Sequence, residues 1–266
     1  MSASGRTFFG RILPLVAVAV ALGLAGGATA ARAQNQLTTA EKKAGWKLLW
    51  DGRTFTGWRC LGFDTVLTAR WAIQGGTIRK IPSGQVPLMA DGRPVEGADL
   101  MTIGTYRDFE LSFEWKVAPG ANSGVKYNVS EELSKSYPPG HSALGFEYQV
   151  LDDDRHPDGK LPIHRAASLY DLIAPNQDKQ LKPVGQWNTG RIVLRGNHGE
   201  HWLNGRKVVE YELGTPAMDS LLARSKYHTI MGFADRRAGH IVLQDHVDEA
   251  WFRNIRIREL KPTASR

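Results

Sequence analysis

The sequence contains one cysteine, Cys60, among its 266 residues. A single cysteine cannot form an intrachain disulfide, so the fold must depend on its hydrophobic core. Cys60 lies in the segment that begins with Trp58, and we expect its thiol to be buried rather than reactive. No cysteine follows the N-terminal apolar stretch, so the chain lacks a lipid-attachment residue at that place.

Long blocks of lysine and arginine are also missing. The formal net charge of the chain is +7, but Arg6, Arg11 and Arg32 lie in the first 33 residues, which leaves +4 for the remaining 233. A modest charge without a basic block is not typical of nucleic-acid binding, and we expect no nucleic-acid partner.

The N-terminus has the pattern of a secretory signal. Arg6 and Arg11 form a basic region, residues 12–27 are apolar, and Ala31-Arg32-Ala33 fits the small-x-small cleavage rule. This pattern predicts a signal peptide over residues 1–33 and export to the periplasm or the medium. The alternative is an uncleaved anchor, but the stretch is short for a membrane span, so we expect no stable membrane insertion after cleavage.

Helical periodicity, internal repeats and linkers are scarce. We expect residues 34–45 to form a flexible lead-in, with a helical turn at 39–44, and residues 46–261 to form one domain. The Asn204-Gly205 pair is a strong hairpin signal, because a type I′ turn requires positive φ at both central residues. Period-two alternation predicts strands at 109–117, 124–129, 145–151, 191–195, 198–203, 206–211, 227–233, 240–244 and 251–259.

Many short strands separated by glycine-rich turns predict an all-β fold. We expect a two-sheet antiparallel jelly-roll β-sandwich, in which one face of each strand fills the core.

The segment Gly145–Asp153 carries the most informative polar pattern. Glu147 and Gln149 alternate with Phe146, Tyr148 and Val150, so they should point away from the core. Lys126 and Asn128 should share that face if their strand is a neighbour. The alternative is an ordinary solvated sheet face, where these residue types are common.

This strand disfavours a conventional glycosidase site. Such enzymes use two carboxylates, in some cases at alternating positions of one strand. Here the position after Glu147 on the same face is Gln149, whose amide can act neither as acid nor as nucleophile.

Residues 152–159 concentrate four aspartates and His156. Asp152 and Asp153 are candidate ligands for a divalent metal, the only cofactor that the sequence suggests. The alternative is that these aspartates cap and turn a surface loop, which is the common use of such clusters.

Other candidate groups carry weaker signals. His201 shares its face with Leu203, so a packed histidine is as plausible as a functional one. Trp187 is a candidate platform for stacking a sugar, although tryptophans in sandwiches are more often core residues. Gln244-Asp245-His246 places an acid beside an imidazole.

Several segments taken together resemble the 3-keto-disaccharide hydrolase family, over about residues 46–260. The matching segments are residues 48–52, 57–58, 71–76, 109–111, 120–127, 145–153, 168–172, 186–188, 201–205, 243–246 and 252–255. The sequence departs from the family pattern at Val247, where glycine is usual, and at residues 63–65.

The resemblance implies a concanavalin A-like jelly roll and cleavage of glycosides that carry a ketone at C3. A ketone acidifies the hydrogen on C2, so such a site needs a base, an electrophile and a proton donor. On this interpretation Glu147 is the general base or a metal ligand, Lys126 stabilises the enolate, and His156 or His246 protonates the leaving group. The expected sugar-binding residues are Asn122, Asn128, Gln149, Trp187, His201 and Gln244.

Three further functions are compatible with the sequence. The first is a lectin-like module without catalysis, which the same polar face would suit, because fold does not decide function. The second is a conventional glycosidase, and the third is an exported interaction protein.

Overall fold

The computed structural model describes residues 1–2, 34–90, 92, 97–137 and 142–261. An eight-stranded antiparallel sheet, sheet A, has the order β11-β10-β9-β6-β13-β4-β3, and β1 also pairs with β13. Its strands are β1 (Lys47–Leu48), β3 (Trp71–Gln74), β4 (Thr77–Lys80), β6 (Phe109–Val117), β9 (Asn188–Arg195), β10 (His198–Leu203), β11 (Arg206–Glu212) and β13 (Ala250–Glu259).

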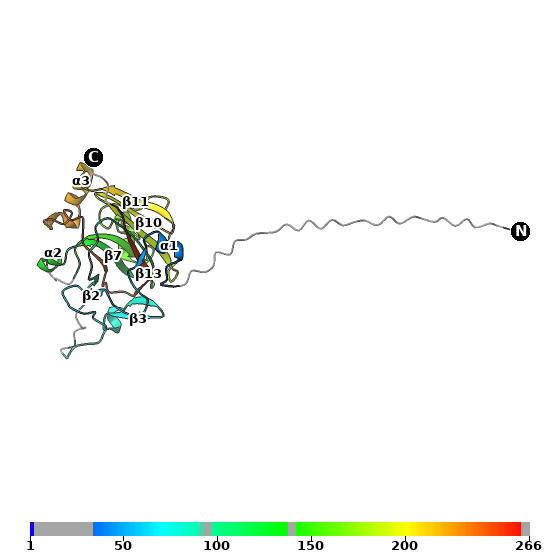
Figure 1. The fold of residues 1–266 in the computed structure, drawn as a ribbon, viewed down its shortest axis with the longest axis horizontal. Coiled ribbons are helices and arrows are strands. Elements are labelled where there is room, and N and C mark those ends of the chain that lie inside the picture. Colours follow the sequence, from blue (N-terminus) through cyan, green and yellow to red (C-terminus); the bar gives the residue numbers. More distant parts are fainter. Residues whose placement is uncertain (3–33, 91, 93–96, 138–141, 262–266) are drawn as a thin grey trace. The chain divides into compact units, whose positions relative to one another are not determined.

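A second antiparallel sheet, sheet B, has five strands in the order β2-β5-β12-β7-β8. They are β2 (Trp58–Cys60), β5 (Leu100–Thr102), β7 (Asn122–Val129), β8 (Phe146–Leu151) and β12 (His240–Leu243). The architecture is the two-sheet antiparallel jelly-roll sandwich that the alternation predicted, of the concanavalin A-like kind that the family resemblance implied. Figure 1 shows the strands gathered centrally, with the short helices α2 (Glu131–Ser136) and α3 (Pro216–Arg224) at the periphery.

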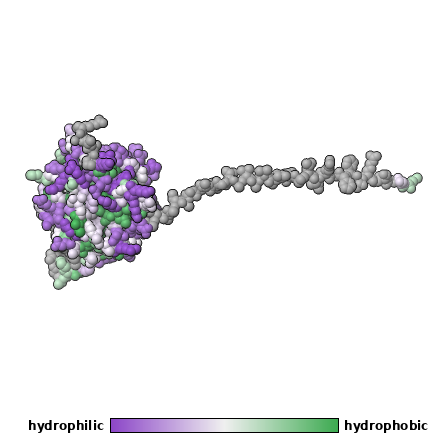
Figure 2. Space-filling model, viewed as in Figure 1, coloured by the Kyte–Doolittle hydropathy of each residue, from purple (hydrophilic) through white to green (hydrophobic). Residues whose placement is uncertain are grey.

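The core fills the space between the two sheets. Phe113 of sheet A and Tyr148 of sheet B meet edge to face, with ring centroids 5.3 Å apart. Trp71 and Trp115 are almost fully buried, and so is Cys60, as predicted from its place after Trp58. The face drawn in Figure 2 is mainly hydrophilic, with apolar residues in smaller areas between. The apolar half of each alternating strand therefore supplies the core.

Most of the predicted strands are confirmed within one to three residues at their ends. The Asn204-Gly205 turn joins β10 to β11 with φ values of 49° and 83°, as a type I′ turn requires. The helical turn predicted for the lead-in is α1 (Thr39–Lys43), which begins with a capping box between Thr38 and Glu41.

The strand predicted at residues 227–233 is wrong. This segment contains the 3₁₀ helix η4 (Lys226–Thr229), whose start is capped by the Ser225 hydroxyl, and then turns at Gly232 with φ of 74°. The segment folds back on itself, because the rings of Tyr227 and Phe233 stack with their centroids 3.9 Å apart. Two residues six positions apart in one extended strand could not meet in this way. The helix α3 was also not expected, although Thr215 caps it and Pro216 occupies its first turn.

The predicted signal peptide, residues 1–33, lies almost entirely outside the described residues, so cleavage and export stay predictions. In the described part of the chain, no helix is both long and apolar enough to span a bilayer.

Candidate active site

The polar face of sheet B is built by the pairing of β7 with β8. Lys126 lies directly opposite Glu147 in the register, and Gly124 lies opposite Gln149. Their neighbours Val125, Tyr127, Phe146, Tyr148 and Val150 belong to the core cluster on the other side of the sheet. Glu147, Gln149 and Lys126 therefore point away from the core and share one surface, as the alternation predicted.

Gly124 makes room for the Glu147 carboxylate. A Cβ atom at position 124 would lie 2.0 Å from Oε1 of Glu147, closer than any side chain tolerates. The carboxylate therefore lies over the backbone of β7, between the strand that carries it and β12. On the far side of Gly124, the backbone NH of Gln244 donates to the Gly124 carbonyl at 2.9 Å.

A short segment extends sheet B beyond β8. Leu169 forms a bridge with Tyr148, the NH of Gln149 donates to the Ser168 carbonyl, and the NH of Tyr170 donates to the Glu147 carbonyl. Because Leu169 belongs to the core, the alternate residues Ser168 and Tyr170 lie on the same face as Glu147.

Lys126 is held by protein acceptors. Its ammonium donates to Oδ2 of Asp99 at 3.2 Å and to the Ala143 carbonyl at 3.0 Å, and the residue is 4% exposed. Burial disfavours its charged form, but the negative charges of Asp99 and Glu147 outweigh this effect, and the pKa of Lys126 is raised.

Glu147 is buried, with 3% of its surface exposed. Burial raises the pKa of its carboxyl above the ordinary value, and the positive charges of Lys126 and Lys226 oppose this rise. Nothing in the described part of the chain donates a hydrogen bond to the carboxylate. A desolvated carboxylate without donors is a stronger base than a solvated one, which suits proton abstraction.

A second layer of residues covers this face. The Tyr170 hydroxyl donates to Oδ2 of Asp158 at 3.2 Å, and the Lys226 ammonium lies 4.1 Å from the centre of the Tyr170 ring. The rings of His156 and His246 meet edge to face at 6.2 Å. Burial lowers the pKa of His246, so its imidazole is mainly neutral near pH 7.

Several buried polar atoms on this face have no hydrogen-bond partner among the described residues. They are Gln149 Oε1, Ser168 Oγ, Gln244 Oε1 and His246 Nδ1. Of these residues, His246 lines a cavity of about 200 Å³, which Asp99 and Asp245 also border. Unpaired buried polar groups are costly, and sugar hydroxyls could both donate to and accept from such atoms. The arrangement is therefore suited to a polyhydroxylated ligand.

The structure brings most of the predicted site residues together. Glu147, Lys126, Gln149 and Gln244 lie on the sheet face, and the Gln149 amide donates to Oδ1 of Asn122 at 3.2 Å. His156 and His246 lie in the covering layer. Asn128 is at the far end of β7, where its amide donates to the Arg236 carbonyl and its Oδ1 atom has no partner in the described chain.

Two predicted sugar-binding residues lie elsewhere. His201 is fully buried between the sheets, where Nε2 meets the Tyr127 hydroxyl at 2.7 Å and Nδ1 meets the carbonyls of Ala167 and Ser168. Trp187 lies on the outer face of sheet A, stacked with the Arg253 guanidinium at 4.0 Å. Neither lies on the face of Glu147, because His201 belongs to β10 of sheet A and Trp187 packs on side chains of the same sheet.

The predicted metal ligands have a structural role. Asp152 accepts from the backbone NH groups of Gly120, Asp154 and Arg155, and Asp153 accepts from the NH of Ala166 and pairs with Lys179. These aspartates therefore cap and turn the loop.

Among the described residues, one group of histidine and carboxylate side chains has spacing suited to a metal. It is His198, Glu200 and Glu210 on sheet A, and Lys207 already pairs with both glutamates.

Sequence reasoning found His156 and His246 of the covering layer, and Asp158 only as one of the clustered aspartates. It missed Asp99, Tyr170 and Lys226, because the place of these connecting segments over sheet B does not follow from alternation. The Ser168–Leu172 segment was part of the family resemblance, which was the one signal for Ser168 and Tyr170.

Comparison with known proteins decides the family. A model of the family described as the 3-keto-alpha-glucoside-1,2-lyase-like domain matches residues 45–258. The chain belongs to this family. Within the 3-keto-alpha-glucoside-1,2-lyase-like family, it is 37% identical over 235 residues to a 3-keto-disaccharide hydrolase of Bacteroides thetaiotaomicron, a match that covers 81% of this chain and 79% of the relative.

Two solved structures from Parabacteroides distasonis, each described as a candidate glycosyl hydrolase, are similar to the chain. One has a TM-score of 0.73 at 26% identity and covers 86% of this chain and all of the other. The second has a TM-score of 0.60 at 27% identity and covers 81% and 99%, respectively. Together with the family match, these relatives indicate an enzyme related to glycoside hydrolases.

Proposed function

We propose that this enzyme cleaves glycosides whose sugar carries a ketone at C3, in the site around Glu147. The observation that carries the proposal is the buried Glu147 carboxylate, which lies over Gly124, accepts no hydrogen bond from a described residue and is influenced by the positive charges of Lys126 and Lys226. The family description and the named relative act as independent support, because both refer to 3-keto sugars.

The chemistry begins with a proton transfer. Glu147 takes the C2 hydrogen, and the electron pair moves into the C2–C3 bond and onto the C3 oxygen, which gives an enolate. The pair then returns, the C1–O bond breaks, and the leaving oxygen takes a proton from the His156–His246 pair, which we assign this role in its singly protonated form. Addition of water at C1 of the resulting enone completes a net hydrolysis.

A single free carboxylate suits this chemistry better than direct hydrolysis does. Asp99 is paired with Lys126, and Asp158 accepts from the Tyr170 hydroxyl. Gln149 stands where a second same-strand carboxylate would be needed. We therefore expect little activity on the unoxidised glycoside.

Replacing the proposed base tests this function. Glu147→Gln keeps the side-chain shape but removes the base, so release of aglycone from a chromogenic 3-keto-glucoside should fall by about 10²–10⁴-fold. Glu132→Gln, an exposed site on α2, is the matched control and should leave turnover unchanged. Near-normal turnover by Glu147→Gln, with an unchanged melting temperature, would exclude the assigned role.

A lectin-like binding module is the second candidate, because the amide oxygens of Gln149 and Gln244, which have no partner among the described residues, would also bind a sugar that is not cleaved. A thermal shift with a 3-keto-glucoside but no aglycone release by the native enzyme would favour it.

A further inference from the structure

The two lysines beside Glu147 differ in what holds their ammonium groups. Lys126 donates to Asp99 and to the Ala143 carbonyl. The Lys226 ammonium, in contrast, makes no hydrogen bond or ion pair with any described residue. Its N–H groups are therefore free to meet a ligand, while those of Lys126 are largely used within the protein.

Aromatic rings hold the Lys226 ammonium in place. It lies 4.1 Å from the centre of the Tyr170 ring and 5.1 Å from that of Tyr227. A ring face attracts a cation without accepting its N–H groups as a carboxylate would. The position of the ammonium is thus fixed while its hydrogen-bonding capacity stays available.

The Tyr170 ring that contacts the Lys226 ammonium is itself held in place. His164 stacks on Tyr170 at 4.5 Å with an interplanar angle of 15°, and its Nε2 meets Oδ1 of Asp171 at 2.8 Å. The other oxygen of Asp171 accepts from the Lys226 backbone NH at 2.6 Å. One carboxylate therefore connects the lysine backbone to the ring system that carries its ammonium.

Lys226 is also electrostatically coupled to the proposed base. Lys226 is exposed as a whole residue, but partial desolvation of its ammonium lowers its pKa, and the negative charge of Glu147 opposes this change. Conversely, Lys226 lowers the pKa of Glu147. Geometry places the two groups on the same side of sheet B, because Tyr170, whose ring centre lies 4.1 Å from the ammonium, pairs with the backbone of Glu147.

We propose that Lys226, rather than Lys126, is the catalytic electrophile that binds the C3 ketone oxygen and stabilises the enolate. This inference rests on the proposed function. An N–H of Lys226 donates to the ketone oxygen, Glu147 removes the C2 proton, and the charge that develops on oxygen is met by the ammonium. The bond between oxygen and lysine is a hydrogen bond throughout, so no further reactant is needed. Lys126 is a positioning residue that supports Glu147 by its charge.

Exchange of the C2 hydrogen isolates this step. A 3-keto-1,5-anhydroglucitol has no aglycone at C1, so glycoside cleavage cannot follow proton removal, and exchange of its C2 hydrogen with D₂O, measured by NMR, reports that step alone. Lys226→Met should reduce exchange by about 10²–10³-fold, the usual cost of one oxyanion donor, whereas Lys226→Arg should recover part of it. Lys160→Met, an exposed lysine of the neighbouring 3₁₀ helix η2 (Pro157–Lys160), is the matched control.

The outcomes separate the two proposals. Absence of both exchange and cleavage in the native enzyme would overturn the proposed function. Native exchange that is lost in Glu147→Gln but normal in Lys226→Met would overturn only the role of Lys226. Loss of exchange on chelation that a divalent metal restores, or a borohydride-trapped adduct on Lys226, would also overturn the electrostatic role assigned here.

Discussion

At the scale of single residues, the site depends on Gly124, which has no side chain. Gly124 sits in the middle of β7 with ordinary strand geometry, so no turn requires glycine there. The space above it is filled by the end of the Glu147 side chain. The glycine is therefore explained by where the carboxylate lies and not by backbone conformation.

Gly124→Ala should impair activity more than stability. The added Cβ would meet the flexible end of Glu147, which can turn away, so we expect at least a tenfold loss of kcat and a change in unfolding free energy of about 1 kcal/mol. Parallel kinetics and urea unfolding measure both effects. Gly84→Ala, where no atom lies within 4 Å of the added Cβ, is the control. A fully active Gly124→Ala would contradict the placement of the carboxylate.

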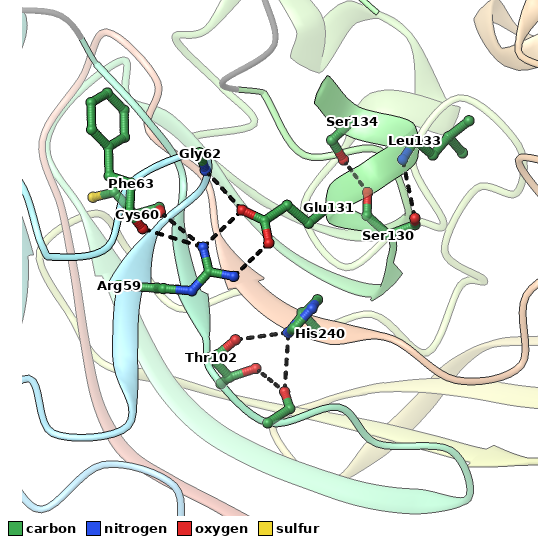
Figure 3. Close-up of polar contacts among 11 residues, drawn as sticks. Arg59, Cys60, Gly62, Phe63, Thr102, Ser130, Glu131, Leu133, Ser134 and His240 are labelled. Carbon is green, nitrogen blue, oxygen red and sulfur yellow. Dashed lines mark hydrogen bonds and ion pairs between the residues drawn. The ribbon is translucent and has the colours of Figure 1, made fainter. Parts of the chain in front are cut away.

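At the scale of elements, an ion pair between Arg59 and Glu131 connects β2 to α2. The Arg59 guanidinium donates to both carboxylate oxygens of Glu131, at 2.8 and 2.5 Å, and the Gly62 NH donates to the same carboxylate (Figure 3). The hydrogen bond from Arg59 lowers the pKa of Glu131 to about 2. Because α2 precedes the segment that supplies the Ala143 carbonyl to Lys126, this pair helps to place one wall of the site.

Glu131→Gln should destabilise the enzyme in a pH-dependent way. A carboxyl with a lowered folded-state pKa stabilises above its unfolded value of 4.5, and the effect is lost as the pH falls towards about 2. Allowing for the partial exposure of the pair, we expect a loss of about 1–2 kcal/mol at pH 7 that shrinks at pH 3. Urea unfolding at pH 7, 5 and 3 checks this.

Glu132→Gln removes the same charge from the same helical turn but from an exposed position. It should cost far less than Glu131→Gln at every pH. Equal losses for the two variants would mean that the helix dipole, rather than the pair with Arg59, explains the effect.

At the scale of the whole molecule, His201 joins the two sheets. It comes from β10 of sheet A and contacts Tyr127 of sheet B and the carbonyls of the segment beside β8. Burial lowers its pKa from 6.5 to about 4, so the folded protein holds it neutral. Both ring nitrogens are already occupied, which makes it a packing residue of the interior.

Protonation of His201 should weaken the sandwich in mild acid. The unfolded chain binds this proton from about pH 6.5 downwards and the folded chain only near pH 4, so stability is lost across that window, by up to about 3 kcal/mol. His201→Gln should remove this loss while lowering stability at pH 7, and His228→Gln, at an exposed position, should not. Unfolding free energies from pH 7.5 to 4 give the comparison.

Alternation in the sequence determined the sandwich and the outward direction of Lys126, Glu147 and Gln149. A strand has a period of two, so every alternate residue is assigned to one face as soon as its neighbours are apolar. The same local rule fixed the Asn204-Gly205 hairpin and excluded a carboxylate pair on β8.

Only the tertiary structure decided that this polar face is buried, and which loops cover it. Tyr170 and Lys226 meet on the Glu147 side of sheet B although they are far apart in the sequence, and no local period encodes that approach. It also decided that His201 and Trp187 lie away from the site, since a residue pattern gives the face of a strand but not the sheet to which the strand belongs. Position across the sandwich is set by packing of the whole chain, which is why the fold followed from the sequence and the full set of site residues did not.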